Sequence, residues 1–325
     1  MTYIGLLAIA EMNTVGELEL SLHFLRPQLI LDGITRDNES SEWLTKTFLH
    51  PVNRHRLRGV GMTTLDERAQ RGAEIRARFG GGTPSSGSVP GSREMAPDLH
   101  RIADEALFGS IWQRPALKIE HREMIVLSVL TVLQRENQLR RHVESAVTLG
   151  LTAQQVIEIM IHASFYGGVP TAFTSMGVAQ EVFKAEGISF SPQLVFDPSE
   201  TPDDLYHRGV ERREELMGVP IEMSRPGPVT QAEREFNRLT TEYYWGSVWT
   251  RPGLDLQSRS ICTLAALTVL GQEGPLHSHI NGALNIGLNQ EEIIEVFIQT
   301  TFYGGLPFTR AAMDIANEIF LGKKG

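Results

Sequence analysis

Residues 254–307 read LDLQSRSICTLAALTVLGQEGPLHSHINGALNIGLNQEEIIEVFIQTTFYGGLP. Residues 117–170, LKIEHREMIVLSVLTVLQRENQLRRHVESAVTLGLTAQQVIEIMIHASFYGGVP, repeat this segment without a gap. Gly109 matches Gly246 at the same offset at which Tyr166 matches Tyr303. Roughly 30 of about 75 aligned positions are identical, far above chance for an ungapped comparison. The chain is therefore predicted to contain an internal duplication.

Each copy has the pattern of a helical bundle. Residues 119–134 are apolar nearly all round, which is typical of a buried central helix. Further helices are predicted at 98–112 and at 136–149, the latter with Gly150 as its left-handed C-terminal cap and Gly287 in the same place in the second copy. Thr152 with Gln155, and Asn289 with Glu292, have the spacing of capping boxes that open the next helix.

These patterns predict an all-α protein of two tandem helical bundles. The predicted parts are an N-terminal extension at 1–62, a first repeat at 63–185, a linker at 186–203 and a second repeat at 204–325. Residues 17–24 alternate between polar and apolar, so the extension is predicted to hold short strands. Its functional interpretation is an arm that covers a site or joins subunits, and the alternative is a loosely attached terminus.

Bulk composition limits the possible functions. The net charge of −9 over 325 residues argues against nucleic acid as a partner, because phosphate binding needs a basic face. No apolar run approaches the roughly 20 residues of a membrane span. The single cysteine, Cys262, excludes a disulfide within the chain and any chemistry of paired thiols. The opening residues lack a basic leader, so we expect a cytoplasmic protein without a secretory signal.

Histidine follows glutamate by six residues at the start of the same predicted helix in both copies. The pairs are Glu136 with His142 and Glu273 with His279. Imidazole titrates near neutral pH and suits general acid–base chemistry, so these four are the candidate catalytic residues. The alternative is a structural histidine. No metal site is predicted, because His277 and His279 lie two apart and point to different helix faces.

Arg122 and Arg259 occupy the same place in the buried central helix of each copy. A buried cation needs an anion, which is either a substrate carboxylate or a carboxylate of the protein. The structural alternative pairs Arg122 with Glu136 and Arg259 with Glu273.

Tyr166 and Tyr303 are candidates for substrate binding because each precedes Gly-Gly, where the backbone can approach another group closely. The alternative for both is a core tyrosine whose hydroxyl is satisfied within the protein. His162, replaced by Gln299 in the second copy, and Cys262, in an apolar helix, are interpreted as structural.

Several segments of the second copy carry a resemblance to a known family, and the first copy has the same frame. They are 249–254, Arg259-Ser260, 264–267, Glu273, 279–284, Gly287-Leu288 and 302–307. In these residues the chain resembles the carboxymuconolactone decarboxylase family over about 65–185 and 203–322. A related alkylhydroperoxidase branch uses a Cys-x-x-Cys pair, whose positions here hold Arg135 and Gln138, or Gln272 and Pro275. A thiol peroxidase is thereby excluded.

The resemblance implies a decarboxylase of a small carboxylated lactone in the breakdown of aromatic compounds, acting without cofactor or metal. It makes Arg122, Arg135 and Arg259 candidate carboxylate anchors, and His142 and His279, with His277, candidate general acids. Glu136 and Glu273 would orient the imidazole or the arginine. The upstream acidic residue of the related branch falls on Glu123 in one copy and on Ser260 in the other, so unequal activity of the copies is expected.

Two other functions stay open at this point. One is a different cofactor-free lyase or isomerase that acts on an enolisable metabolite, and the other is a non-catalytic assembly protein. The resemblance further implies that single-repeat relatives assemble as hexamers with sites between subunits. A trimer of this tandem chain is therefore expected. The expected substrate is a small molecule that carries a carboxylate.

Overall fold

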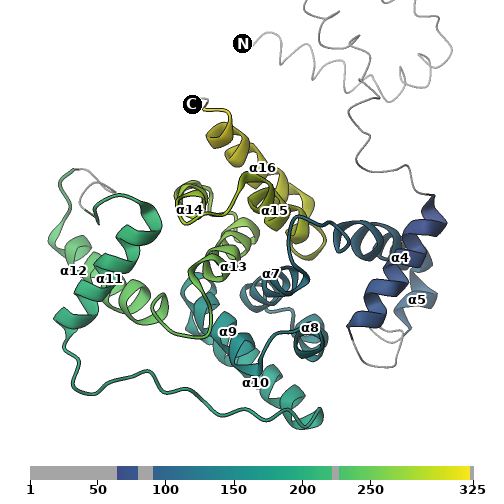
Figure 1. The fold of residues 1–325 in the computed structure, drawn as a ribbon, viewed down its shortest axis with the longest axis horizontal. Helices are drawn as coiled ribbons and strands as arrows, with labels where there is room; N and C mark the ends of the chain where they lie inside the picture. The colour runs from purple at the N-terminus through teal and green to yellow at the C-terminus, as the bar shows by residue number, and fades with distance from the viewer. Residues whose placement is uncertain (1–63, 80–90, 222–226, 323–325) are drawn as a thin grey trace, which may run out of the picture. The chain divides into compact units, whose positions relative to one another are not determined.

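The computed structural model describes residues 64–79, 91–221 and 227–322. Every regular element in these ranges is a helix (Figure 1), which confirms the all-α prediction. The strands predicted within residues 1–62 lie outside the described residues.

The two copies have the same order of helices, except that the short α5 has no counterpart among the described residues of the second copy. The first copy contains α4 (Leu65–Arg78), α5 (Ser92–Met95), α6 (Pro97–Ile102), η1 (Ala103–Ile111), α7 (Ile119–Val132), α8 (Glu136–Thr148), α9 (Ala153–Gly167) and α10 (Val169–Ala185). The second contains α11 (Pro202–Met217), α12 (Gln231–Leu239), η3 (Thr240–Val248), α13 (Leu256–Val269), α14 (Glu273–Asn285), α15 (Gln290–Gly304) and α16 (Leu306–Phe320).

The predicted helix ends are confirmed. Gly150 and Gly287 follow α8 and α14 with φ of 103° and 93°, a conformation that favours glycine. The capping boxes that open α9 and α15 are both present, with Thr152 and Asn289 at the N-cap.

The helix predicted at 98–112 is divided into α6 and the π-helical segment η1. In η1 the N–H of Trp112 donates to the carbonyl of Leu107, five residues back, at 3.0 Å. The N–H of Trp249 donates to the carbonyl of Tyr244 in the same way, also at 3.0 Å. An extra residue per turn rotates the side chains beyond it, and such segments are frequent at functional sites. Both copies therefore present a tryptophan directly after the wider turn.

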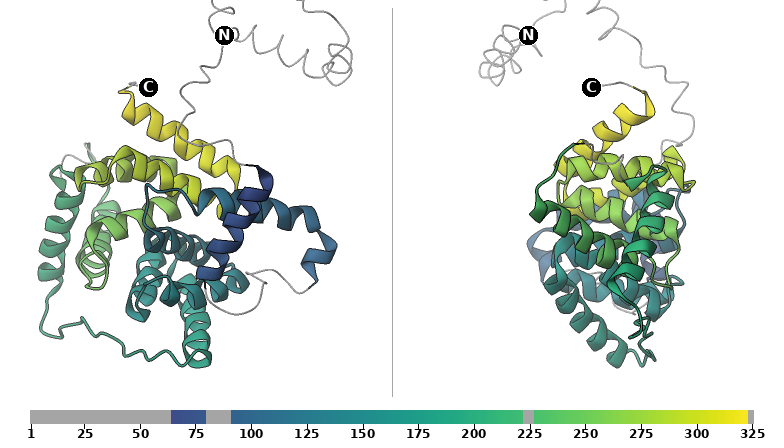
Figure 2. Two further views of the ribbon diagram at one scale, coloured as in Figure 1. Left: turned by 45° about the vertical axis from the view of Figure 1, so that its right-hand side comes forward. Right: turned by 90° about the vertical axis from the view of Figure 1, so that its left-hand side faces the viewer.

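The two repeats share one interior. Helices α7 and α13 pack against each other at the centre, with α9 and α10 on one side of them and α15 and α16 on the other (Figures 1 and 2). Leu254 and Cys262 of the second copy belong to the core of the first, and Ile125 and Val129 of the first belong to the core of the second. The described residues of both repeats accordingly belong to one compact unit.

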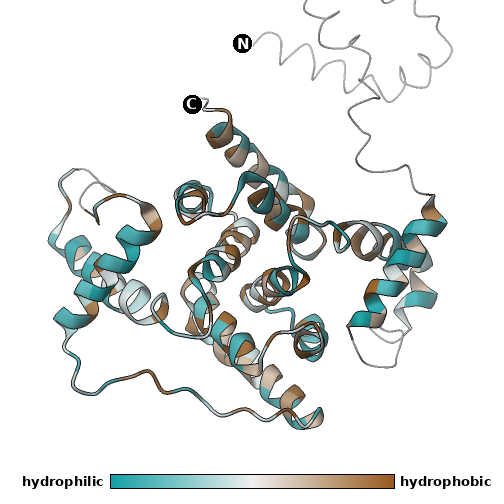
Figure 3. Ribbon diagram, in the orientation of Figure 1, coloured by the Kyte–Doolittle hydropathy of each residue, from teal (hydrophilic) through white to brown (hydrophobic). Residues whose placement is uncertain are grey.

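In each copy the first helix packs very closely against the π-helical segment, α4 against η1 and α11 against η3. A Cβ placed on Gly109 would lie 2.0 Å from the carbonyl oxygen of Arg68 in α4, and one on Gly246 would lie 2.1 Å from that of Leu205 in α11. Figure 3 shows that α4, α11 and α12 are mainly hydrophilic, as expected for helices at the surface.

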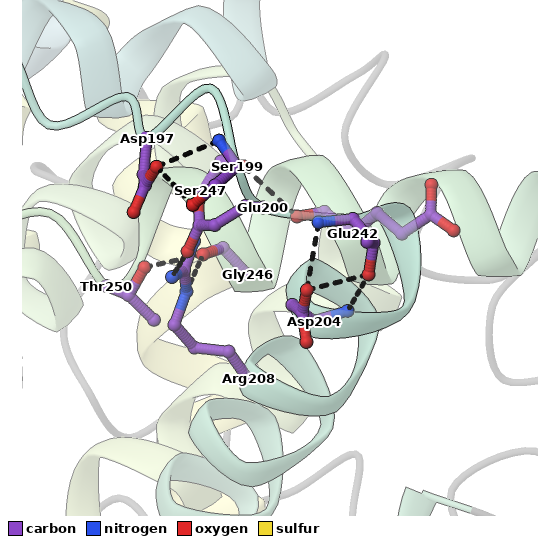
Figure 4. Close-up of polar contacts among 10 residues, drawn as sticks. Asp197, Ser199, Glu200, Asp204, Arg208, Glu242, Gly246, Ser247 and Thr250 are labelled. Carbon is purple, nitrogen blue, oxygen red and sulfur yellow. Dashed lines mark hydrogen bonds and ion pairs between the residues drawn. The ribbon is translucent and has the colours of Figure 1, made fainter.

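The linker is fixed at its second end by polar contacts with α11 and η3 (Figure 4). Arg208 forms an ion pair with Glu200, and its Nε donates to the carbonyl of Gly246 at 2.8 Å. Thr201 caps α11 in a capping box with Asp204. At the first end, Ile188 and Phe190 pack on the core of the first copy. The linker is thus held at both ends.

Candidate functional site

The repeats exchange aromatic residues in two places. Trp112 of the first copy donates its indole N–H to the hydroxyl of Tyr303 of the second at 3.1 Å. In the reciprocal place, Tyr244 of the second copy is hydrogen-bonded to Tyr166 of the first. Each candidate site is therefore built from both repeats, and neither copy alone would complete it.

The first site is formed by Glu123, His142, Trp112, Tyr303 and Phe79. His142 on α8 places its Nδ1 3.0 and 3.1 Å from the two carboxylate oxygens of Glu123 on α7. The Glu123 side chain is fully buried, whereas that of His142 keeps 10% exposure. A carboxylate at Nδ1 fixes the orientation of the imidazole, so Nε2 is the ring nitrogen left for a substrate.

Three aromatic rings surround this imidazole. Trp112 is stacked on His142 with centroids 6.2 Å apart, and the edges of Tyr303 and Phe79 approach it at 5.4 and 6.1 Å. Burial, with the charge of Glu123, raises the pKa of Tyr303 well above its ordinary value, so its hydroxyl stays protonated. That hydroxyl accepts from Trp112, which leaves its own hydrogen for donation.

The second site has the same frame without the carboxylate; it comprises Ser260, His279, Trp245, Trp249 and Tyr166. The ring of His279 is stacked with those of both tryptophans at 6.1 and 6.0 Å. Ser260 replaces Glu123, and neither its hydroxyl nor Nδ1 of His279 has a hydrogen-bond partner in the described part of the chain. Burial, assisted by the charge of Arg213, lowers the pKa of His279 to about 4. This imidazole is neutral at physiological pH.

A chain of buried polar groups leads away from the second site. Nε2 of His162 lies 2.8 Å from the hydroxyl of Thr263, which lies 2.6 Å from the hydroxyl of Tyr166. Burial, with the nearby charge of Arg259, lowers the pKa of His162 well below its ordinary value. Burial also raises the pKa of Cys262 to about 12, so its thiol is not ionised at neutral pH.

The buried arginines pair with carboxylates of the opposite repeat. Arg122 donates through Nη2 to Glu295 at 2.8 Å and through Nη1 to the amide oxygen of Gln299 at 3.0 Å. Glu295 also accepts from Arg114 at 2.5 Å. The pairing of Arg122 with Glu136 considered from sequence is therefore wrong.

Arg259 is held more loosely. Its Nη2 donates to the backbone carbonyl of Arg251 at 2.6 Å and lies 3.7 Å from Glu158. Glu158 is bound more tightly by Arg251, at 2.7 to 3.2 Å. The alternative pairing of Arg259 with Glu273 is likewise wrong. Burial lowers the pKa of Arg259, and the charge of Glu158 opposes this effect.

Four of the residues predicted for the site lie exposed at the starts of α8 and α14: Arg135, Glu136, Glu273 and His277. Six residues rotate an α-helix by roughly 240°, so Glu136 cannot share the inward face of His142, nor Glu273 that of His279. The hydrogen bond that orients His142 comes from Glu123 instead. Catalytic or substrate-binding roles for these four stay predictions without a contact to support them.

Sequence reasoning missed Trp112 and Trp249 as site residues, and it missed the carboxylates Glu158 and Glu295. The sequence did contain a signal for them: Trp112 is equivalent to Trp249, and Glu158 is equivalent to Glu295, so both residue types are identical in the two copies. The arginines were recognised because each is a charged residue in an apolar central helix. Their carboxylate partners, Glu158 and Glu295, lie on α9 and α15 among apolar residues and were not recognised.

Within the described ranges, no group of three or more histidine, cysteine, aspartate or glutamate side chains is arranged to hold a metal ion. No helix there is both long and apolar enough to cross a membrane.

Fold and site together define an all-helical tandem protein with a buried Glu–His pair in its first repeat, beside Tyr303 of the second. The model of the carboxymuconolactone decarboxylase family matches this chain twice, at residues 97–181 and 234–318. The chain belongs to that family, as a member with two repeats. Both matches lie inside the predicted repeats.

The chain is also similar in sequence to individual decarboxylases. The chain is 34% identical over 118 residues to the 4-carboxymuconolactone decarboxylase of Acinetobacter baylyi, which covers 36% of this chain and 88% of the relative. It is 33% identical over 124 residues to the nitrosuccinic acid decarboxylase of Metarhizium robertsii, covering 36% of this chain and 85% of that protein. Both relatives are named as decarboxylases, which supports decarboxylase activity in general terms.

Proposed function

We propose that this chain is a cofactor-independent decarboxylase of a small carboxylic acid and that the first site performs the reaction. The observation that carries this proposal is the hydrogen bond between Glu123 and His142, placed beside the hydroxyl of Tyr303. A proton donor and a hydrogen-bond donor for an oxyanion thus lie next to each other in a buried setting.

The substrates named for the two relatives indicate which chemistry such a site must serve. Both are carboxylic acids that carry an electron-withdrawing group, a lactone carbonyl in one and a nitro group in the other. When the bond to the carboxylate breaks and carbon dioxide leaves, its electron pair passes to an oxygen of that group. A proton must then be added to carbon. The site therefore has to stabilise an oxyanion and supply a proton.

In the proposed mechanism, the imidazole of His142 donates Nδ1–H to Glu123 and delivers a proton from Nε2 to carbon. The carboxylate of Glu123 keeps the ring in place through its contact with Nδ1. The hydroxyl of Tyr303, positioned by Trp112, donates to the developing oxyanion in a water-poor environment, where such bonds contribute most.

The substrate carboxylate needs a cation that it can reach, and the side chain of Arg122 is only 1% exposed, whereas that of Arg76 is 16% exposed. We assign this role to Arg76 on α4. Its guanidinium lies 4.3 Å from the ring centroid of Phe108 and forms an ion pair with Asp104. The charge of Arg76 also acts on the hydroxyl of Tyr303, which supports a place beside the first site.

The test uses the purified full chain with 4-carboxymuconolactone and, separately, with nitrosuccinate, and it follows the release of carbon dioxide. His142→Ala is expected to lower kcat by about 100-fold or more, because general acid catalysis contributes that much. His279→Ala is the matched control in the other copy and is expected to retain turnover. Glu123→Gln is expected to lower kcat while circular dichroism stays unchanged.

Loss of turnover in His279→Ala with full activity in His142→Ala would move the reaction to the second site. A folded wild-type protein that turns over neither compound would refute the proposed substrate class.

A further inference from the structure

A cleft of about 760 Å³ lies between α9, α10 and the start of the linker, and its lining contains neither His142 nor His279. Ile161 of α9, Phe173 and Phe183 of α10 and Phe190 of the linker supply apolar walls. Its volume falls within the range usual for small-molecule sites. Phe173 is 69% exposed, which is unusual for an aromatic side chain that has no partner to cover it.

Polar groups in the cleft include one guanidinium, that of Arg251. Its bonds to Glu158 use Nε and Nη2, so within the described ranges Nη1 remains for a ligand. Among the described residues, Glu158 is also the only carboxylate that forms an ion pair with Arg259. Two guanidiniums thus share one carboxylate, which leaves one positive charge that a ligand anion would balance.

The duplication does not repeat this lining. Arg310 and Asp314 of the second copy stand at the positions of Phe173 and Gly177 in the first. The aromatic wall contributed by Phe190 comes from the linker, which joins the repeats and belongs to neither. The cleft is therefore a feature of the tandem chain rather than of a single repeat.

We propose that this cleft binds a small organic carboxylate with an apolar body, whose carboxylate contacts Arg251 and whose body lies between Phe173 and Phe190. Charge selects the ligand class: an apolar molecule without a carboxylate would leave the positive charge unbalanced, and a cation would be repelled. The bound acid is not turned over, because the cleft has neither of the site histidines.

Octanoate is a suitable probe, with 1-octanol as the neutral molecule of equal chain length. Isothermal titration calorimetry on the full chain is expected to give one octanoate per chain and at least tenfold weaker binding of octanol. Arg251→Gln is expected to reduce this difference between the two probes, since it removes the charge that selects the carboxylate.

Gly177 allows a test that does not disturb the Arg251 pair. It lies in α10 with open space where a side chain would project, and its backbone conformation suits any residue. Gly177→Trp is expected to fill the cleft and abolish octanoate binding, whereas Gly177→Ala, the matched control, keeps it. Because both replace a helix glycine, thermal stability is expected to be equal to or above wild type.

His142→Ala separates this inference from the proposed reaction, since it should bind octanoate with unchanged affinity. Loss of octanoate binding in that variant would place the probe in the first site and overturn the proposal. Equal binding of octanol, no binding at millimolar octanoate, or full binding to Gly177→Trp would overturn it as well.

Discussion

His142 and His279 occupy equivalent positions in the two repeats but have different surroundings. His142 has a carboxylate at Nδ1, whereas Nδ1 of His279 has no partner among the described residues. At His279, burial without an adjacent carboxylate favours the neutral ring. Because Ser260 replaces Glu123, only His142 has the carboxylate contact that the proposed proton transfer uses, whereas His279 packs between two tryptophans.

The low pKa of His279 predicts a pH-dependent loss of stability. In the folded chain the ring takes up a proton only near pH 4, whereas the ordinary pKa of 6.5 applies after unfolding. Between these values the unfolded state binds more protons, so the free energy of unfolding falls as the pH is lowered from 6.5 to 4. Two and a half pKa units correspond to roughly 3 kcal/mol.

Urea unfolding at fixed protein concentration measures this contribution. His279→Gln is expected to lose roughly 3 kcal/mol less than wild type between pH 7 and pH 4. His277→Gln is the control, because that side chain is exposed. Parallel pH profiles for wild type and His279→Gln would contradict the prediction.

For individual residues, the sequence predicted the members of the candidate site better than it predicted the contacts between them. His142, Glu123 and Tyr303 were all candidates and do come together in the structure. Glu136 was assigned to His142 because the two are near in sequence, whereas the true partner lies on another helix. A spacing along one helix shows which residues share a face, but contacts between helices depend on packing that one chain does not reveal.

A buried ion pair joins α7 to α15, between Arg122 and Glu295. Glu295→Gln would leave Arg122 buried beside a neutral amide, and loss of one partner from a buried pair costs about 3–5 kcal/mol. Chemical denaturation should show a loss of that size. Glu273→Gln, at an exposed position, is the control and should match wild type. A Glu295→Gln protein as stable as wild type would show that the pair contributes little.

The close contact between α4 and η1 depends on Gly109. A Cβ at this position would meet backbone atoms of Arg68, which cannot move aside as the end of a side chain can. Gly109→Ala is therefore expected to lower the free energy of unfolding by about 3 kcal/mol, the upper range for overpacking. Gly177→Ala provides the opposite control, because its added methyl meets no atom and improves helix propensity. Equal melting temperatures for Gly109→Ala and wild type would contradict this account.

Most helices could be predicted because their signals are local: apolar periodicity, capping boxes and left-handed glycines act within a few residues. The π-helical segments could not, since a single inserted residue in a helix leaves no pattern that a normal helix lacks. They nevertheless set the direction of Trp112 and Trp249, and so the aromatic walls of both sites.

For the whole molecule, the duplication predicted two bundles, and the structure adds that they exchange residues. The core of each copy contains side chains of the other, and the carboxylate for each buried arginine comes from the opposite repeat. The sequence of one repeat alone does not reveal these contacts between the repeats. They explain why the chain keeps two complete repeats although only one retains the Glu–His pair: the second copy supplies Tyr303 and Glu295 to the first.

We propose that the chain assembles further, as a trimer. Val169 and Leu306 occupy equivalent positions at the starts of α10 and α16 and are 48% and 61% exposed, so both repeats present an apolar side chain at the same place. Paired exposed apolar residues are typical of interaction surfaces. Three chains of 36.2 kDa correspond to a mass of about 109 kDa, which light scattering after gel filtration would measure.

The double variant Val169→Lys/Leu306→Lys is expected to shift that mass toward 36.2 kDa, because lysines placed in an apolar interface must lose their hydration. Leu194→Lys is the control, since Leu194 is 89% exposed in the linker and has no equivalent in the duplication. A wild-type protein that elutes as a single chain at micromolar concentration would refute the trimer. A trimer that survives the double variant would place the interface elsewhere on the molecule.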